Sequence, residues 1–231
     1  IHETSKELMV LRPYQIYGVE KIVEQVRNTK QNGYIWHTTG SGKTLTSFKA
    51  SQIIMKMPDV EKVLFVVDRK DLDYQTMKEY DRFEKGAANS NTSTAILKKQ
   101  LEKSDCKIII TTIQKLSIFI EKNKGHEVFD KKVVIIFDEC HRSQFGDMHV
   151  AIVKSFKKYH LFGFTGTPIF PVNANTGIKH ANLKTTEQAF GDKLHTYTIV
   201  DAINDKNVLT FRVDYIKTME AEPDIDDKQV A

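Results

Sequence analysis

Short apolar runs alternate with longer stretches of helical character along most of this chain. The runs are rich in Val, Ile and Phe and lie at Tyr34–Trp36, Val63–Val67, Ile108–Ile110, Val133–Phe137 and Leu161–Phe164. Strands that are apolar throughout are covered on both faces, so the pattern predicts a mostly parallel sheet with helices on both sides. Because strands and helices alternate, the order of elements indicates repeated βαβ units and the α/β class.

Helical spacing is clearest near the N-terminus. Apolar residues recur with the helical period from Tyr14 to Val26, and a second helix is expected to open at Lys43-Thr44. Two polar stretches, Gly86–Thr94 and Pro171–Lys184, are expected to be surface loops. Apolar and polar residues alternate over 209–215, which predicts a strand with one wet face.

Composition excludes several classes of protein. The chain has 34 Lys plus Arg against 30 Asp plus Glu, a net charge of +4 over 231 residues, which is an ordinary globular balance and names no partner. Its two cysteines, Cys106 and Cys140, cannot form a disulfide framework, and no zinc-type spacing is present, so a reducing cytoplasm is expected. The longest apolar run, Val133–Phe137, is far shorter than the roughly 18 residues of a membrane span, and the first residues do not form a signal peptide.

The sequence HTTGSGKT, which ends at Thr44, lies between a predicted strand and a predicted helix, the context of a phosphate-binding loop. Gly40 and Gly42 allow the backbone to turn sharply and to bring its N–H groups close to phosphate oxygens. Lys43 is expected to reach the β- and γ-phosphates and Thr44 to bind Mg²⁺, while the helix N-terminus adds partial positive charge. The alternative is a glycine-rich turn without a ligand.

Two adjacent carboxylates, Asp138 and Glu139, follow the apolar run that ends at Phe137. Ligand sites in open α/β sheets lie at the carboxyl ends of the strands. Neighbouring acids repel unless a cation or a proton intervenes, so the pair predicts Mg²⁺ at Asp138. Glu139 is then expected to orient the attacking water or act as its general base. The alternative is a solvated acidic turn at the end of a strand.

A third segment, Thr165-Gly166-Thr167, follows the last of the five apolar runs at the same edge of the sheet. Its hydroxyl groups are expected to hydrogen-bond toward the carboxylates and to relay the state of the nucleotide to the rest of the chain. His141 is expected to couple the acidic pair to Thr165. A histidine hydrogen-bonded in the interior is the alternative for His141.

These motifs together resemble the first motor domain of superfamily 2 helicases and translocases. The resemblance is carried by Lys43-Thr44, Asp138-Glu-Cys-His141 and Thr165-Gly-Thr-Pro168. Leu11–Gln15 is similar to the adenine-recognising segment of that superfamily, and Val67–Gln75 and Thr111–Gln114 are similar to its loops that contact the nucleic-acid backbone. The later segments Asp138–Gly146, Gly163–Phe170, Phe190-Gly191 and Tyr197–Ile203 together resemble the restriction (R) subunit of type I restriction–modification enzymes. The likeness covers nearly the whole chain from Leu11 to Tyr215.

The resemblance implies a RecA-like P-loop NTPase fold and an ATP-driven motor that moves double-stranded DNA. It also implies methyltransferase (M) and specificity (S) subunits as partners, and a bacterial or archaeal cytoplasm. The implied enzyme is the ATP hydrolase and DNA translocase component of a type I site-specific deoxyribonuclease. ATP and Mg²⁺ are the implied cofactors.

The same resemblance assigns roles to individual residues. The expected catalytic residues are Lys43, Asp138, Glu139 and His141, and the expected Mg²⁺ ligands are Thr44 and Asp138. The expected ATP-binding residues are Gln15, for the adenine, and Thr38, Thr39, Gly40, Ser41, Gly42, Lys43 and Thr44. Thr165, Gly166 and Thr167 are the expected coupling residues, and the expected contacts to the DNA backbone are Arg69, Lys70, Thr111, Thr112, Gln114 and Lys115. For the DNA set, a solvated charged loop and an ordinary strand end are the alternative.

We expect residues 1–218 to form the ATP-binding motor domain and residues 219–231 an acidic tail or linker. In this superfamily a second domain supplies arginines to the ATP site, but after Thr167 the chain has a single arginine, Arg212, which lies in no arginine-rich motif. The nuclease signature Glu-x-Lys cannot be placed. Because the chain also begins at Ile1 without an initiator Met, we expect a nearly inactive piece of a longer protein, without the nuclease and second motor domains.

Two other functions remain open from the sequence. One is a helicase domain of another superfamily 2 branch, acting on RNA or DNA, and the other is a nucleotide-responsive interaction module. A GTPase is disfavoured because no Asn-Lys-x-Asp guanine signature is present. Four histidines, His149, His160, His180 and His195, are expected to be core or surface residues rather than metal ligands. His37 replaces the usual first glycine of the phosphate loop, and its effect on nucleotide affinity is left open.

Overall fold

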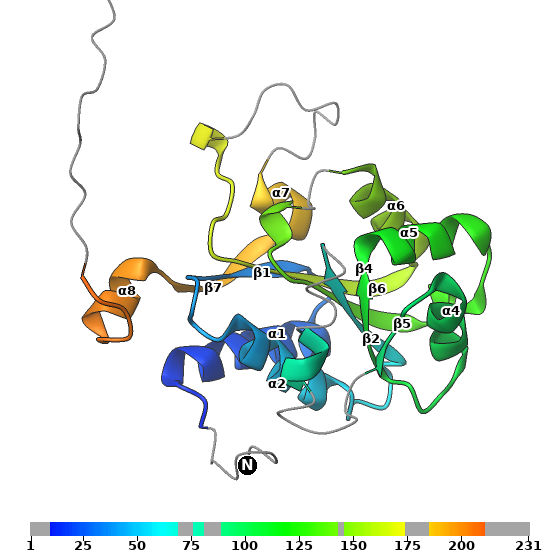
Figure 1. Cartoon of the computed structure of the whole chain (residues 1–231), viewed down its shortest axis with the longest axis horizontal. Coiled ribbons are helices and arrows are strands. Elements are labelled where there is room, and N and C mark those ends of the chain that lie inside the picture. Colours follow the sequence, from blue (N-terminus) through cyan, green and yellow to red (C-terminus); the bar gives the residue numbers. More distant parts are fainter. Residues whose placement is uncertain (1–9, 69–75, 81–88, 143–145, 174–184, 211–231) are drawn as a thin grey trace, which may run out of the picture.

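The computed structural model describes residues 10–68, 76–80, 89–142, 146–173 and 185–210. Within these residues lies a parallel sheet of seven strands in the order β3-β4-β2-β5-β6-β1-β7 (Figure 1). The strands are β1 (Gly33–His37), β2 (Lys62–Val67), β3 (Asn89–Ser90), β4 (Ile108–Thr112), β5 (Lys132–Phe137), β6 (Lys158–Thr165) and β7 (Asp192–Tyr197). The predicted α/β class and parallel sheet are confirmed, and the five apolar runs lie in β1, β2, β4, β5 and β6.

Helices cover both faces of the sheet, as predicted. The α-helices are α1 (Pro13–Asn28), α2 (Lys43–Ile54), α4 (Thr94–Glu102), α5 (Ile113–Lys122), α6 (Asp147–Ser155), α7 (Thr186–Phe190) and α8 (Ile199–Asn204). Three 3-10 turns are η1 (Glu127–Asp130), η2 (Cys140–Arg142) and η3 (Pro171–Asn173). Figure 1 shows α1 and α2 on one face of the sheet and α4, α5, α6 and α7 on the other.

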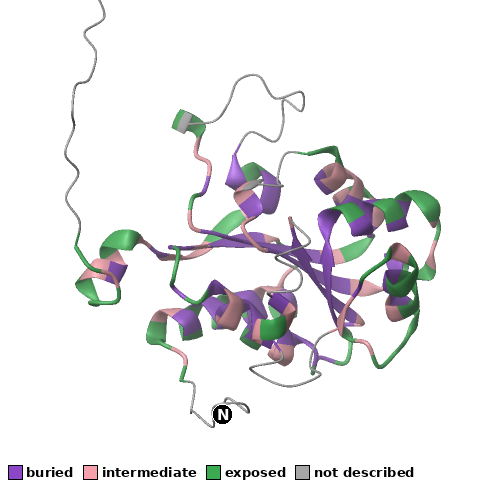
Figure 2. Ribbon diagram, viewed as in Figure 1, coloured by how far each residue is buried: buried purple, intermediate pink, exposed green. Residues whose placement is uncertain are grey.

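Each face of the sheet has its own core, because successive residues of a strand point to opposite sides. Phe65 and Ile136 pack with α1 and α2, whereas Leu64 and Ile135 pack with α5 and α6. The strands are therefore buried almost throughout (Figure 2). This burial on both sides explains why the strands appear in the sequence as continuous apolar runs rather than as alternating patterns.

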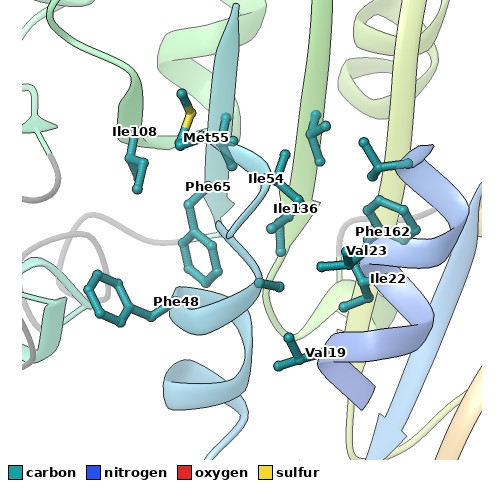
Figure 3. Close-up of a cluster of buried hydrophobic side chains, with 14 of the residues drawn as sticks. Val19, Ile22, Val23, Phe48, Ile54, Met55, Phe65, Ile108, Ile136 and Phe162 are labelled. Carbon is teal, nitrogen blue, oxygen red and sulfur yellow. The ribbon is translucent and has the colours of Figure 1, made fainter. Parts of the chain in front are cut away.

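The core beneath α1 and α2 fixes these helices against the strands (Figure 3). Ile22 of α1 and Phe162 of β6 lie together in this cluster, and Phe48 of α2 packs near Phe65 of β2. Because α2 begins at Lys43, this packing also holds the start of α2, and with it the phosphate loop, at the edge of the sheet.

One expected loop is partly wrong. Within Gly86–Thr94, Asn89 and Ser90 form the edge strand β3, which pairs with β4. Asn91 is 3% exposed, and its amide donates to the Ile110 carbonyl while accepting from the Thr111 hydroxyl. A polar side chain can thus satisfy strand backbone, which hides an edge strand in a polar sequence. The sequence does not predict the strand β7 either, because β7 is only half-buried and its sequence is polar.

Several expectations lie outside the described residues. Of the expected strand at 209–215, residues 211–215 are not described, and residues 209 and 210 are not in a strand. The acidic tail at 219–231 also falls outside. Of the expected loop Pro171–Lys184, residues 171–173 form η3. In the described part of the chain, no helix is long and apolar enough to cross a membrane.

Candidate nucleotide-binding site

Three strand ends meet at the carboxyl edge of the sheet, because β5, β6 and β1 are neighbours. The loop after β1 leads into α2, the turn after β5 carries Asp138 and Glu139, and β6 ends at Thr165 before a turn that contains Gly166. Gly166 lies against the phosphate loop, since a Cβ there would be 3.4 Å from both the His37 carbonyl oxygen and the Thr39 nitrogen. The structure therefore brings the three predicted motifs together.

The phosphate loop depends on two glycines in the left-handed region. Gly40 has φ of 77° and Gly42 has φ of 74°, and Gly42 is the residue before α2. A Cβ on Gly42 would also lie 2.6 Å from Nε2 of Gln15. Side chains are strained in this conformation, so the turn requires glycine at both places and additional space at Gly42.

Lys43 and Glu139 form an ion pair across the site. Lys43 Nζ lies 3.2 Å from Glu139 Oε1, and the side chains are 9% and 30% exposed. A nearly buried ammonium group is costly without a negative partner, and Glu139 supplies that partner. The pair joins the start of α2 to the turn after β5.

Asp138 and Glu139 lie in an environment that disfavours a second negative charge. Burial and, to a smaller extent, the neighbouring Glu139 raise the pKa of Asp138, and Lys43 opposes both effects; the resulting pKa is about 6. The Glu139 amide donates to Asp138 Oδ1 at 2.9 Å. Glu139 itself has φ of 43°, a conformation that non-glycine residues rarely adopt. Strain and a raised pKa at one turn are typical of a functional site.

His141 connects the acidic turn to the turn after β6. Its Nδ1 lies 2.9 Å from Thr165 Oγ1 and 3.5 Å from Glu139 Oε2. The Thr165 hydroxyl also accepts a hydrogen bond from the Thr167 amide at 3.0 Å. A continuous set of polar contacts therefore runs from Lys43 through Glu139 and His141 to Thr165.

Two residues of α1 hold the phosphate loop from the other side. Gln15 is 4% exposed, and its Nε2 donates to the Ser41 carbonyl at 3.0 Å. The Tyr14 hydroxyl donates to the same carbonyl at 2.9 Å. Gln15 Oε1 accepts from the Arg12 amide at 2.9 Å, so the side-chain amide is anchored at both ends. Gln15 thus contacts the phosphate loop, and its expected role at the adenine stays a prediction.

His37, which replaces the usual glycine, packs away from the loop into an aromatic cluster. Its Nε2 lies 2.9 Å from Nδ1 of His195, and its ring meets Tyr14 and Tyr197 edge-on. Burial, with smaller contributions from His195 and Lys43, lowers the pKa of His37 to about 3, so the ring is neutral at pH 7. Tyr14 stacks on Tyr197 with ring centroids 3.6 Å apart.

A cleft of about 710 Å³ opens beside this aromatic cluster. It is lined by Arg12, Tyr14, Tyr17 and Tyr197, together with residues of α8 such as Asp201. Its lining combines three tyrosines with polar and charged side chains, among them Arg12 and Asp205. Concave spaces that combine aromatic walls with polar groups are typical of small-ligand sites. Sequence reasoning missed Tyr14, Tyr197 and His195, although the position of Tyr14 directly before Gln15 was an available signal.

The six expected DNA contacts do not form one exposed surface. Arg69 and Lys70 lie outside the described residues. Thr111 and Thr112 are fully buried, and the Lys115 ammonium group is directed inward to the Asn91 carbonyl. Gln114 is exposed, and its amide donates to the Asp68 carbonyl at 3.1 Å. The role of these residues therefore stays a prediction.

The donor set for a metal ion is small. Within the described residues, no three His, Cys, Asp or Glu side chains gather as a metal site. Mg²⁺ in nucleotide sites needs only one or two protein oxygens, because phosphates and water supply the others. Asp138 and Thr44 are such oxygen donors, and the raised pKa of Asp138 fits a carboxylate that a cation would stabilise.

The fold and this edge define a P-loop ATPase domain. The model of the family described as SWI2/SNF2 ATPase matches residues 14–231. A relative from Staphylococcus aureus (strain COL), the type I restriction enzyme SauCOLORF180P endonuclease subunit, is 52% identical over 222 residues. A relative from Mycoplasma pneumoniae, the C-terminal part of the putative type I restriction enzyme MpnIIP endonuclease subunit, is 44% identical over 171 residues, 68% of this chain and 83% of that one. The chain therefore belongs to the SWI2/SNF2 ATPase family, in the branch found in type I restriction enzyme endonuclease subunits.

Coverage of the relatives is uneven. The match to the Staphylococcus aureus relative covers 95% of this chain but 23% of that protein. Among solved structures, the type ISP restriction-modification enzyme LlaGI aligns over 86% of this chain and 21% of its own, with a TM-score of 0.62 and 21% identity. The UvsW helicase of bacteriophage T4 aligns over 81% of this chain and 61% of its own, with a TM-score of 0.60 and 17% identity. At such identities the structures support the fold alone.

Proposed function

We propose that the chain is the first motor domain of an ATP-driven double-stranded DNA translocase in a type I restriction endonuclease. The observation that carries the proposal is the Lys43–Glu139 ion pair, which joins the phosphate loop to the acidic turn at 3.2 Å. A nucleotide at this edge would meet the phosphate loop, the acidic pair and the coupling turn at once. Residues 1–218 would form the domain, and nuclease and second motor domains would lie elsewhere in the longer protein.

ATP binding would exchange the partner of Lys43. The ammonium group would leave the Glu139 carboxylate for the β- and γ-phosphates, and the backbone N–H groups from Thr38 to Thr44 would hold the phosphate oxygens. Thr44 and Asp138 would hold Mg²⁺, which neutralises phosphate charge when bound. Deprotonated Asp138 would no longer suffer uncompensated repulsion from Glu139.

Release from Lys43 would leave Glu139 available to the attacking water. The strained backbone at Glu139 fixes the carboxylate at the edge of the site rather than in solvent. The position of His141 would depend on whether Glu139 is paired with Lys43 or with water, because His141 contacts both Glu139 and the Thr165 hydroxyl. Thr165, Gly166 and Thr167 would then pass the state of the site to a neighbouring domain.

The adenosine would occupy the cleft beside Gln15. Tyr17 and Arg12 line this cleft and offer an aromatic face and a cation. The Gln15 amide, now bonded to the Ser41 carbonyl, would turn toward the base and thereby couple the base to the shape of the phosphate loop. The neutral imidazole of His37 would support this arrangement through His195 and Tyr14.

Double-stranded DNA and the M and S subunits are the proposed partners, by analogy with the restriction enzymes that the chain resembles. Arg69, Lys70 and Gln114 are proposed contacts to the DNA backbone; of these, Gln114 is exposed in the described structure. Thr111 and Lys115 would reach DNA only through a movement that breaks their hydrogen bonds to Asn91. Thr112, which is also buried, would have to become exposed. Contacts of this kind would give affinity without sequence information.

A titration of the chain with a non-hydrolysable ATP analogue, with and without Mg²⁺, tests the site. We expect binding that Lys43→Ala weakens at least tenfold and that Asp138→Ala makes independent of Mg²⁺. Lys49→Ala is the matched control, because Lys49 is exposed on the same helix. Equal affinity in wild type and Lys43→Ala would remove the site assignment.

Hydrolysis by the chain alone should be slow. A missing arginine from a second domain costs about 10³–10⁵ in rate in related phosphoryl-transfer enzymes. We therefore expect nucleotide binding with little turnover and little stimulation by duplex DNA. Fast DNA-stimulated hydrolysis by this chain would contradict the proposal, and stimulation by single-stranded RNA would favour an RNA helicase domain instead.

A further inference from the structure

A second concave site lies at the opposite edge of the sheet, where β5 and β6 begin. Its volume is about 550 Å³, and five cations line it: Arg27, Lys30, Lys132, Lys157 and Lys158. We call it the basic cavity. The residues come from the end of α1, from β5 and from the start of β6, so the fold assembles charges that are far apart in the sequence.

The sheet itself forces two of these cations together. Lys132 and Lys158 are directly paired residues on the neighbouring strands β5 and β6. Like charges in this relation destabilise a sheet. Lys157 precedes Lys158 and adds a third positive charge at the same strand end. The mutual repulsion of these charges destabilises the free protein, and a bound anion would remove that repulsion.

Carboxylates neutralise only part of the charge. Lys132 Nζ lies 2.6 Å from Asp59 Oδ2, and Lys157 Nζ lies 2.6 Å from Asp130 Oδ1. Arg27, Lys30 and Lys158 are exposed, and within the described residues they form no ion pair with a carboxylate. Five cations against two carboxylates leave an excess of three positive charges around the basic cavity.

His160 adds a buried, uncharged side chain to the lining of the basic cavity. His160 is 4% exposed, and its Nε2 lies 3.0 Å from the Thr29 carbonyl oxygen, to which it donates. Burial lowers the pKa of His160, so its ring adds no charge. Lys132 Nζ donates to the Val26 carbonyl at 3.2 Å, which ties the strand to the end of α1. Lys132 and His160 are thus held by backbone carbonyl groups at the end of α1 and just after it, at Val26 and Thr29. The other cations of the basic cavity have no such bond to this helix end in the described residues.

We propose that the basic cavity is a binding site for a multiply charged phosphate ligand, of the type of pyrophosphate or the polyphosphate chain of a nucleotide. Lysine binds phosphate as a point charge and arginine binds it through paired N–H groups, so the lining has the right donors. The volume lies in the range of small-ligand sites. An excess of three charges matches a di- or triphosphate better than a single monoanion.

The ring of His160 serves as a local reporter in a test with pyrophosphate. We expect saturable shifts of the His160 side-chain signals in NMR spectra of the chain, at constant ionic strength and without Mg²⁺. The variant Arg27→Gln/Lys30→Gln/Lys158→Gln should weaken this binding about tenfold or more, since it removes three exposed charge contacts. These side chains are exposed, so the fold should be retained.

Two matched variants separate this site from other effects. The variant Lys99→Gln/Lys122→Gln/Lys124→Gln loses the same charge from exposed positions elsewhere and should leave the affinity within twofold. Lys43→Ala should leave the His160 shifts unchanged, so failure of the proposed ATP site and failure of this inference are distinguishable.

Three results would overturn the inference: no saturable shift of His160, equal weakening in both triple variants, or the same shifts with chloride at matched ionic strength. Competition arms identify the source of the phosphate. Displacement of pyrophosphate by ATP supports a free nucleotide as ligand, and displacement by a 20-base-pair duplex supports the same phosphate chemistry supplied by DNA.

Discussion

The two edges of the sheet differ in how their positive charges are buried and paired. At the carboxyl edge a single lysine, Lys43, is 9% exposed and is matched to one carboxylate, Glu139. At the amino edge five cations line the basic cavity, two of them pair with carboxylates outside its lining, and the Lys157–Asp130 pair is 72% and 61% exposed. Both edges are built from the ends of the same strands.

The difference shows what each edge can do. A buried charge with one partner changes its energy strongly when that partner is replaced, which suits a site whose state must change during a reaction. Exposed charges are screened and individually weak, so they act together and attract anions without being committed to one geometry. The carboxyl edge is therefore where single substitutions should have the largest effect.

The largest expected effect is that of Glu139→Gln. The substitution keeps a hydrogen-bond acceptor for Lys43 but removes the carboxylate that would activate water, so hydrolysis should fall by about 10²–10⁴. ATP-analogue affinity should be unchanged or higher, because Lys43 no longer has a competing charge. Single-turnover hydrolysis in a protein that also carries the second motor domain measures the rate.

Glu24→Gln is the control for this experiment, since Glu24 lies exposed on α1 and pairs with Lys21 on the same helix. Both properties should remain as in wild type. A Glu139→Gln protein that hydrolyses ATP normally, or that binds the analogue ten times more weakly, would show that Glu139 serves the structure of the loop rather than the reaction.

The next effect is that of Gly42→Ala on stability and affinity together. The new Cβ would sit at φ of 74° and 2.6 Å from Gln15 Nε2, so we expect a loss of about 1–3 kcal/mol in the free energy of unfolding. Nucleotide affinity should also fall at least tenfold, because the strained loop would no longer direct its N–H groups at the phosphate oxygens. Denaturant melts and analogue titrations give the two quantities.

Gly125→Ala separates strain from function. Gly125 has φ of 82°, with no heavy atom of the described structure within 4 Å of an added Cβ, and it follows α5 away from the site. Its substitution should destabilise the chain through φ alone and leave nucleotide affinity intact. If both variants lose affinity equally, the effect is one of general stability and the loop geometry is not special.

Asp138→Asn should stabilise the free protein at high pH. The folded pKa of Asp138, about 6, lies above the unfolded value near 3.9, so the folded state binds more protons between these values and wild-type stability falls as pH rises through that window. The variant lacks this loss. We expect it to exceed wild type by about 1–2 kcal/mol at pH 8 and to match it below pH 4, after allowance for partial solvent access.

Thermal melts at several pH values, each with and without Mg²⁺ and nucleotide, check this prediction. The ligands should stabilise wild type above pH 6 and stabilise the variant less. A variant that is less stable than wild type at pH 8 without ligands would mean that the Asp138 charge is already compensated in the free protein.

The sequence predicts an element correctly where a local pattern of residues has a single structural explanation. Buried parallel strands must be apolar on both sides, so β2 and β5 are evident from the sequence, and the glycines of the phosphate loop mark a turn that needs positive φ. The polar strands β3 and β7 are not evident, because strands at the two ends of the sheet need no continuous apolar run.

The nucleotide site and the basic cavity also differ in how far the sequence predicts them. Lys43 and the pair Asp138-Glu139 are expected from local motifs, but their contact depends on the adjacency of β5, β6 and β1. The basic cavity has no local signal, since Lys30 and Lys158 meet only through the packing of α1 on the start of β6. Long-range assembly of ordinary surface residues leaves no pattern along the chain.

The smallest expected effect is that of Lys157→Gln at the amino edge. The Lys157–Asp130 pair is mostly exposed, so its loss should change the free energy of unfolding by about 0.2–1 kcal/mol at low salt and by less at about 1 M salt, where the Debye length is about 3 Å. Lys132→Gln is the comparison, because Lys132 is 25% exposed and also donates to the Val26 carbonyl. It should cost more and retain its effect in salt, as chemical melts of both variants would show. If Lys157→Gln lowered the free energy of unfolding as much as Lys132→Gln does, the ion pairs at the amino edge would be as strong as the pair at the carboxyl edge. Its cations would then form a fixed ion-pair network rather than a surface open to an anion.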